Sequence, residues 1–314
     1  MRRHQTGSGL HKTALAALFT VGNTLIRYPW RSVGPDMLGL FLLSAVGALI
    51  PALCLYPLFC RLLRRRLSGR RGRLCLAAAL ALPLGAYALF CVWRSCGDYL
   101  NFASGLILPD SGRLLLALGF LGCVVWLSRV SGQGLDAFSL VCFVCVLACV
   151  LALFCFGIPH FRPEYFGVRL PGSAAELAGS LPVLLWESFL PLAVLSGYFA
   201  LAAPRRGERA LSGGTAVGCG ILLLCVLQTL LTFGASYAAE LRYPYSFAVR
   251  ILSVGQYFFR LEGFSYLLDY AACLLRAAVC LAAARRLLGR FFPRLARWLP
   301  PAAGAVIFGI FCLG

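Results

Sequence analysis

Long apolar runs separated by short basic stretches fill most of the chain. Nine of these runs can be drawn as membrane-spanning helices, since crossing a bilayer takes about 20 apolar residues. They cover residues 13–30, 35–60, 74–94, 112–128, 137–157, 181–203, 211–236, 264–286 and 299–313. Inside a bilayer every backbone polar group must be paired, and a helix pairs its own. The pattern therefore predicts an all-α integral membrane protein with about nine transmembrane helices, forming one polytopic domain over residues 1–314.

The arginines lie in alternate loops. Basic clusters precede the first span and follow the second, fourth, sixth and eighth spans, and the largest covers residues 61–73. Because loops rich in Lys and Arg are retained in the cytoplasm, we expect a cytoplasmic N-terminus. The loops at 95–111, 158–180 and 237–263 are then expected on the outer side. The 61–73 cluster also suits contact with anionic membrane lipids.

Composition excludes several classes of protein. A content of 61% hydrophobic residues excludes a soluble fold, and the net charge of +18 comes from arginines in loops rather than from a phosphate-binding face. We therefore predict no nucleic-acid partner. The 15 cysteines lie mostly in apolar runs, where Cys behaves as a small hydrophobe. Cys142, Cys145 and Cys149 have a metal-like spacing, but the run holds no His or carboxylate, so we predict no metal site.

No motif in the chain indicates an enzyme. There is no glycine-rich phosphate loop, no HExxH zinc motif and no nucleophile elbow. We predict no catalytic residue and no cofactor. The N-terminal apolar run ends in Arg27-Tyr28-Pro29-Trp30-Arg31 without a small-residue cleavage site, so it is interpreted as a retained first helix.

The most informative stretch is residues 240–288. Its first half mixes aromatic and charged residues, which suits a segment at the membrane–water interface. Its second half is apolar but carries Asp269 and Arg276, which lie on one helical face and are too costly to face lipid. They are about 10 Å apart along the axis, too far for an easy direct pair. Each either binds a substrate or ion, pairs with another helix, or extends its charge toward the interface.

The run YPYSFAVRILSVGQYFFRLEGF in this stretch resembles the segment before the eighth helix of the spore-germination permeases. These are the B subunits of endospore nutrient-germinant receptors, in the amino acid–polyamine–organocation superfamily. The shared features are Tyr243-Pro244, the core from Ala248 to Gly255, and Arg260-Leu261-Glu262. The family usually has Lys at the position of Arg276, which keeps the charge, and an aromatic residue at the position of Asp269, which is a departure.

The resemblance implies a LeuT-like inverted-repeat helical bundle. The first five-helix repeat would cover residues 13–157 and the second residues 181–314, without the tenth helix that the family usually has. It also implies a permease-like subunit in the spore inner membrane, which acts with the other germinant-receptor subunits and responds to a small-molecule nutrient such as an amino acid. Two alternatives stay open. One is an ion-coupled amino-acid or amine transporter, and the other is a structural subunit with a vestigial pocket.

Interruptions in the first and sixth spans predict the ligand site. Gly22-Asn23-Thr24 breaks the first span, and Pro191 in the sixth removes a helical donor and crowds the carbonyl of Glu187. Paired broken helices at corresponding positions mark the binding site in such transporters. The predicted ligand-binding residues are Gly22, Asn23, Thr24, Trp186, Glu187 and Ser188.

This predicted site suits a small zwitterion. Helix N–H groups exposed at the breaks would favour a carboxylate. Glu187 would accept the ligand's amine, and Trp186 would supply an apolar or cation–π wall. The alternative for Glu187 is a buried carboxyl that is protonated or hydrogen-bonded to the freed backbone.

Overall fold

The computed structural model is helical wherever it describes the chain, and no strand occurs among the described residues. These residues are 3–22, 24, 37–64, 71–108, 112–166, 178–182, 186, 190–202, 207–252, 262–289 and 291–313.

In chain order, the helices are α1 (Arg3–Val21), α4 (Met37–Arg64), α5 (Arg71–Phe102), the π-helical η2 (Ala103–Ile107), α6 (Arg113–Arg129), α7 (Gly132–Gly157), the 3-10 turns η3 (Ile158–His160) and η4 (Pro163–Tyr165), α9 (Leu192–Ala202), α10 (Gly207–Phe233), α11 (Ala235–Glu240), α12 (Pro244–Ile251), α13 (Glu262–Gly289) and α14 (Pro293–Leu313).

Among the described residues, four helices are long and apolar enough to cross a membrane. They cover Ala79–Ile107, Gly132–His160, Gly207–Phe233 and Gly263–Gly289. Shorter apolar helices cover Leu38–Gly47, Leu192–Leu201 and Ala296–Cys312. The predicted class, an all-helical membrane protein, is thereby confirmed. The count of nine spans stays a prediction.

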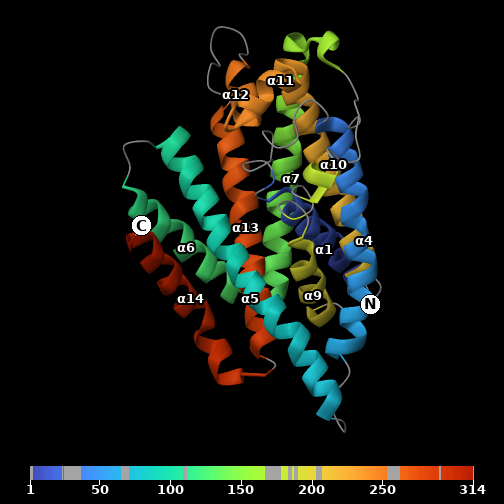
Figure 1. Cartoon of the computed structure of the whole chain (residues 1–314), viewed down its shortest axis with the longest axis vertical. Coiled ribbons are helices and arrows are strands. Elements are labelled where there is room, and N and C mark those ends of the chain that lie inside the picture. The colour runs from blue at the N-terminus through green and yellow to red at the C-terminus, as the bar shows by residue number, and fades with distance from the viewer. Residues whose placement is uncertain are drawn as a thin grey trace.

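Helix α13 forms the centre of the bundle (Figure 1). It packs against α5, α6, α9 and α14, and also against α1, α7 and α12. The run from Ala277 to Ala284 is buried throughout and consists mainly of alanine. Small side chains allow neighbouring helices to approach closely, which is a main source of helix association within a membrane. This composition explains why α13 can be surrounded on all sides.

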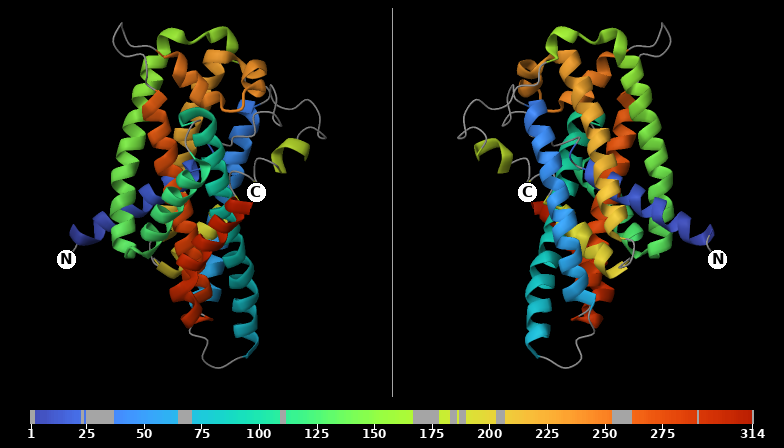
Figure 2. Two further views of the ribbon diagram at one scale, coloured as in Figure 1. Left: turned by 90° about the vertical axis from the view of Figure 1, so that its left-hand side faces the viewer. Right: turned by 90° about the vertical axis from the view of Figure 1, so that its right-hand side faces the viewer.

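Helix α1 is strongly inclined to the other helices, and its first turns project from the side of the bundle (Figure 2). Leu10 is 59% exposed, whereas Leu15 to Phe19 are buried. The end of α1 therefore lies inside the protein. It is held there by close packing against α10 and by contacts with α7 and α13.

The two ends of the bundle differ in charge. The end of α4, the start of α5, the end of α13 and the start of α14, which all carry arginines, lie at one end of the bundle, and α11, α12, η3 and η4 lie at the opposite end (Figure 1). This grouping agrees with the alternation of basic loops along the sequence. Which end faces the cytoplasm stays a prediction.

Several predicted span boundaries are wrong. The predicted third span ends at residue 94, but α5 continues to Phe102 and is followed without a gap by η2. Most of the expected loop at 95–111 is thus helical, because its Leu100, Phe102 and Ala103 are buried in the core. The helix also begins earlier than expected at the first span, at Arg3, and at the ninth, at Pro293. The expected outer loop at 237–263 contains most of α11 and all of α12.

Candidate functional site

The end of α1 is the first half of the predicted site. The helix ends at Val21, and Gly22 follows with a φ of +20°. The Gly22 N–H still donates to the Leu18 carbonyl, at 2.8 Å. The Thr24 hydroxyl donates to the Thr20 carbonyl at 3.1 Å, so a side chain occupies one of the carbonyls near the helix end. The helix ends where the sequence predicts an interruption, although Asn23 lies outside the described residues.

Arg276 of α13 lies directly against this helix end. Its aliphatic chain contacts Gly22 so closely that a Cβ at residue 22 would overlap the Arg276 Cδ. Its guanidinium carbon lies 5.6 Å from the centre of the Phe19 ring, a cation–π geometry. Arg276 is only 4% exposed, and its Nε and Nη1 have no hydrogen-bond partner in the described part of the protein. A buried guanidinium with free donors is thus positioned beside the break in α1.

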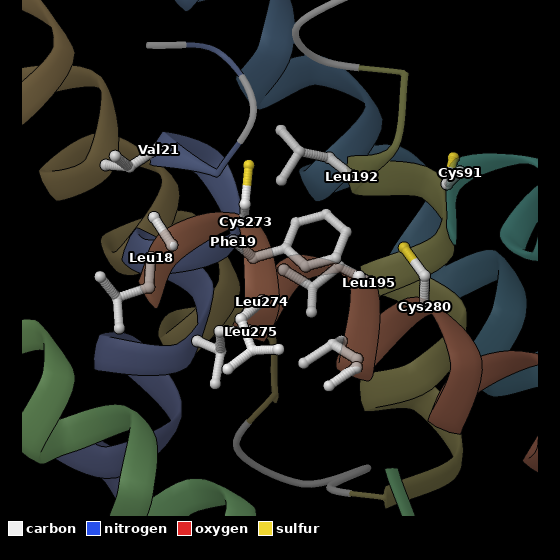
Figure 3. Close-up of a cluster of buried hydrophobic side chains, with 14 of the residues drawn as sticks. Leu18, Phe19, Val21, Cys91, Leu192, Leu195, Cys273, Leu274, Leu275 and Cys280 are labelled. Atoms are coloured by element: carbon white, nitrogen blue, oxygen red, sulfur yellow. The ribbon is translucent and has the colours of Figure 1, made fainter. Parts of the chain in front are cut away.

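Phe19, the ring beside this guanidinium, belongs to a cluster of buried hydrophobic side chains. Leu18 and Phe19 of α1, Leu192 and Leu195 of α9, and residues 273–275 of α13 gather in one cluster (Figure 3). Burial in such apolar surroundings strengthens every electrostatic contact that a ligand would make with Arg276. The cluster therefore joins the ends of the first and sixth segments on one face of α13.

The start of α9 is the second half of the predicted site. The chain turns at Leu190 and Pro191, and α9 begins at Leu192. The first N–H groups are already used, because Ala193 donates to the Leu190 carbonyl and Val194 to the Pro191 carbonyl. The sixth segment is therefore not one continuous helix, and the turn falls at the predicted proline.

Trp186 is the only one of the three remaining predicted residues of the sixth segment that lies within the described part of the chain. Trp186 is 56% exposed and meets the Tyr87 ring edge-on, with 6.3 Å between ring centres. More than half of the Trp186 surface is open, and its role as a wall of the ligand site stays a prediction. Glu187 and Ser188 lie outside the described residues, so their roles stay predictions.

Asp269 lies on the same helix as Arg276 but does not pair with it. The side chain is 1% exposed, and its Oδ1 has no hydrogen-bond partner among the residues that the structure describes. Arg276 meets another helix, as expected, but through the ring of Phe19 rather than through an acid. The chain thus holds two buried charged groups on α13 that are separated by two helical turns.

A cavity lies between α5 and α14, away from the break in α1. It measures about 240 Å³ and is lined by Phe90, Trp93, Arg94, Gly97, Asp98 and Phe311. The sequence does not indicate this cavity, because the predicted third span ends at Arg94, whereas Arg94 lies within α5.

The role of Phe19 beside the guanidinium was also missed. Phe19 and Gly22 are three residues apart and so share a helix face. This spacing is the feature of the sequence that could have linked Phe19 to the helix break. Nothing in the sequence alone links that face to Arg276 on a helix more than 250 residues away.

Comparison with known proteins gives no family. No family model matches the chain, and no curated protein matches it significantly. The likeness to the spore-germination permeases thus rests mainly on residues 243–262.

Proposed function

We propose that the protein is the permease-like subunit of a spore germinant receptor, in which Arg276 holds the carboxylate of a small nutrient beside the end of α1. The observation that carries this proposal is the buried guanidinium at the helix break, with Nε and Nη1 unpartnered among the described residues. Each of these N–H groups can donate a charge-assisted hydrogen bond to a carboxylate oxygen. An α-amino acid supplies such a carboxylate.

The two ends of the nutrient would then meet different groups. Arg276 would take the carboxylate, and the last carbonyls of α1, at the negative end of the helix dipole, would favour the amine. Glu187 stays the proposed acid on the other side of the site. The side chain of the nutrient would lie among the apolar groups of Phe19, Leu192 and Leu195.

Several helix contacts support an inverted repeat of five and four helices, although the packing of α13 against α6 and α9 is not matched to the same extent by the equivalent pairs in the described part of the chain. In that arrangement α1, α4, α5, α6 and α7 correspond to the first repeat, and α9, α10, α13 and α14 to the second. Helix α1 packs against α10, and the equivalent pair, α4 and α9, also packs. Three helices pack against their own equivalents, in the pairs α5–α13, α6–α14 and α4–α10. The pairs α1–α13 and α5–α9 are likewise equivalent, and both are in contact.

This symmetry supports the proposed site as well as the proposed fold. The first interrupted segment begins with α1 and the sixth ends with α9; they are equivalent elements of the two proposed repeats, and α1 and α9 contact each other. In transporters of this architecture, such a pair of broken helices surrounds the substrate.

Ligand-dependent thermal stabilisation of the purified protein tests the proposal. Single amino acids are screened on the parent protein, and the active ones are repeated on Arg276→Lys and Arg276→Met. We expect Met to abolish the shift and Lys to weaken binding about tenfold, since Lys keeps the charge but not the fixed donor geometry of the guanidinium. An unchanged shift in Arg276→Met would refute the role of Arg276.

The second candidate is an ion-coupled amino-acid or amine transporter. The buried carboxyl of Asp269 favours it, because an acid inside a membrane segment is a common coupling group. Uptake of a labelled amino acid by vesicles that contain only this protein would identify a transporter. Spores that lose their nutrient response with Arg276→Met, without any uptake activity in vesicles, would identify a sensor.

A further inference from the structure

Three buried side-chain oxygens without a hydrogen-bond partner among the described residues belong to the first turns of α13 and to α12, which packs against it. They are Oγ of Ser265, Oδ1 of Asp269 and the phenol oxygen of Tyr245. Ser265 and Asp269 are four residues apart on α13 and therefore share one face. Tyr245 comes from α12, which packs against both α13 and α10, and it lies within electrostatic range of Asp269.

This arrangement needs an explanation, because buried polar groups are almost always hydrogen-bonded. Ser265, Asp269 and Tyr245 are 0%, 1% and 2% exposed. An unpaired carboxylate in such surroundings is strongly disfavoured, and each unpaired hydroxyl also carries a desolvation cost. The Cys225 thiol next to the Tyr245 phenol is only a weak hydrogen-bonding group and offsets little of this cost. Three such groups on two helices that pack together form a buried polar cluster whose hydrogen bonds are incomplete in the described part of the protein.

The surrounding charges indicate the kind of partner. The titratable groups that face Asp269 are the Cys225 thiol from α10, the Tyr245 phenol from α12 and the Cys273 thiol from α13. Burial raises the pKa of the Tyr245 phenol well above its usual range, so its hydroxyl stays neutral. In the described part of the chain no cation contacts the carboxyl, and Arg276 is two turns away. The site thus has one acid and no counter-charge of its own.

We propose that Asp269, Ser265 and Tyr245 bind a sodium ion. Carboxylate and hydroxyl oxygens are the ligands that hard cations prefer, and one carboxylate balances one positive charge. A divalent ion would leave a net positive charge buried in the protein. The site lies two turns of α13 from Arg276 and does not depend on the proposed nutrient function.

Sodium-dependent stabilisation of the purified full-length protein tests this inference. The melting temperature is measured at constant ionic strength while NaCl replaces choline chloride. Binding to the folded state alone should raise it by about 3 °C or more once sodium is well above its dissociation constant. Binding of radioactive sodium to the same sample gives an independent measurement.

Four variants distinguish sodium binding at this site from a general effect of salt or of mutation on stability. Asp269→Asn keeps the shape of the side chain but removes its charge, and we expect it to abolish both signals. Ser265→Ala and Tyr245→Phe should each weaken sodium binding about tenfold, since each removes one ligand. Thr215→Val is the matched control, because it removes another buried, unpartnered hydroxyl, on α10, that lies outside this cluster; it should leave the sodium response intact.

The outcomes are distinct from those of the nutrient experiment. If Asp269→Asn does not fold, Ser265→Ala and Tyr245→Phe decide the question. A melting temperature that is equal in sodium and choline, together with no bound radioactive sodium, would overturn the proposal. So would a sodium response that survives in Asp269→Asn.

Discussion

The side chain of Arg276 crosses directly over the Cα of Gly22, at the residue where α1 gives way to the break. A Cβ added at Gly22 would overlap the Arg276 Cδ and lie 3.2 Å from its Cβ, and also 2.9 Å from the Phe19 carbonyl oxygen. Glycine is therefore required at this position for two separate reasons. One is the close approach of Arg276, and the other is a φ of +20°, which residues with a Cβ rarely adopt.

The first prediction concerns this contact. Gly22→Ala should destabilise the protein by about 2 kcal/mol, from backbone strain and from displacement of Arg276. The larger Gly22→Leu should block the nutrient response through that displacement and not only by filling a pocket. Thermal unfolding in detergent measures the first effect, and the nutrient dose–response of spores measures the second.

A double-mutant cycle separates the two causes. Combining Gly22→Ala with Arg276→Ala should recover about 1 kcal/mol, which is the part due to the close approach. Gly220→Ala is the matched control, because a Cβ there meets nothing within 4 Å and α10 is helical at that point. A cycle without coupling would show that Arg276 yields freely and that strain alone explains the cost.

The second prediction concerns the packing of α1 on α10. Gly214 and Gly218, four residues apart, present one glycine face to α1. A Cβ at Gly214 would lie 2.5 Å from the Thr13 carbonyl oxygen, and one at Gly218 would lie 2.7 Å from the Ala17 carbonyl oxygen. Backbone atoms cannot move aside as a flexible side chain can, so the helices would have to separate.

We expect Gly218→Val to lower stability by about 1–3 kcal/mol and to weaken nutrient binding, because the end of α1 would move with the rest of the helix. Gly220→Val, on the open face of α10, should be neutral or slightly stabilising, because valine has a higher helix propensity than glycine. The melting temperatures of the two variants should therefore differ by several degrees. Equal melting temperatures would show that α1 does not depend on this contact.

Much of the helical organisation could be predicted from the sequence, because apolar runs of the required length admit few other structures in a bilayer. The ends of helices were harder to predict. Arg94 has the charge that is typical of a helix end, yet α5 continues for two more turns because Leu100 and Phe102 enter the core. Burial by neighbouring helices decided that boundary, and burial is a tertiary property.

The candidate site could be predicted only in part, because its local features are visible in the sequence and its contacts between distant helices are not. Gly22 and Pro191 disrupt a helix through local sterics, which are visible in the sequence. The partner of Gly22, by contrast, is Arg276, and the unpaired neighbours of Asp269 include Tyr245 from another helix. Such pairs arise only when distant helices pack. The exposure of Trp186 was missed because nothing local shows which side of its segment meets Tyr87.

The third prediction concerns orientation in the membrane. The arginine-bearing ends of α4, α5, α13 and α14 lie together at one end of the bundle, so the positive-inside rule places that end in the cytoplasm. Cysteine introduced at Ser68 should react only with reagents that cross the membrane, and cysteine at Glu164 should react with impermeant ones. The measurement is maleimide labelling of intact cells, on a background in which the native exposed cysteines have been replaced. An externally labelled Ser68→Cys would reverse the topology and invalidate the span assignment.

The final prediction concerns the other receptor subunits. Arg250 is exposed on α12, next to Ile251, which is 48% exposed, and the germination-permease resemblance covers the same segment. If this surface docks a partner, replacing both Arg250 and Arg260 with Ala should weaken association about tenfold, since charged groups at an interface steer and hold a partner. The alternative is that these arginines only anchor the segment at the membrane interface, in which case association is unchanged.

Arg162→Ala is the matched control. Arg162 is exposed at the same end of the bundle but belongs to the connection after α7, and it contacts only the Tyr165 ring and hydroxyl among described side chains. Co-purification of the receptor subunits, normalised to the amount of inserted protein, distinguishes the two roles. A loss with the double variant but not with Arg162→Ala supports docking, and equal recovery of partners in both refutes it.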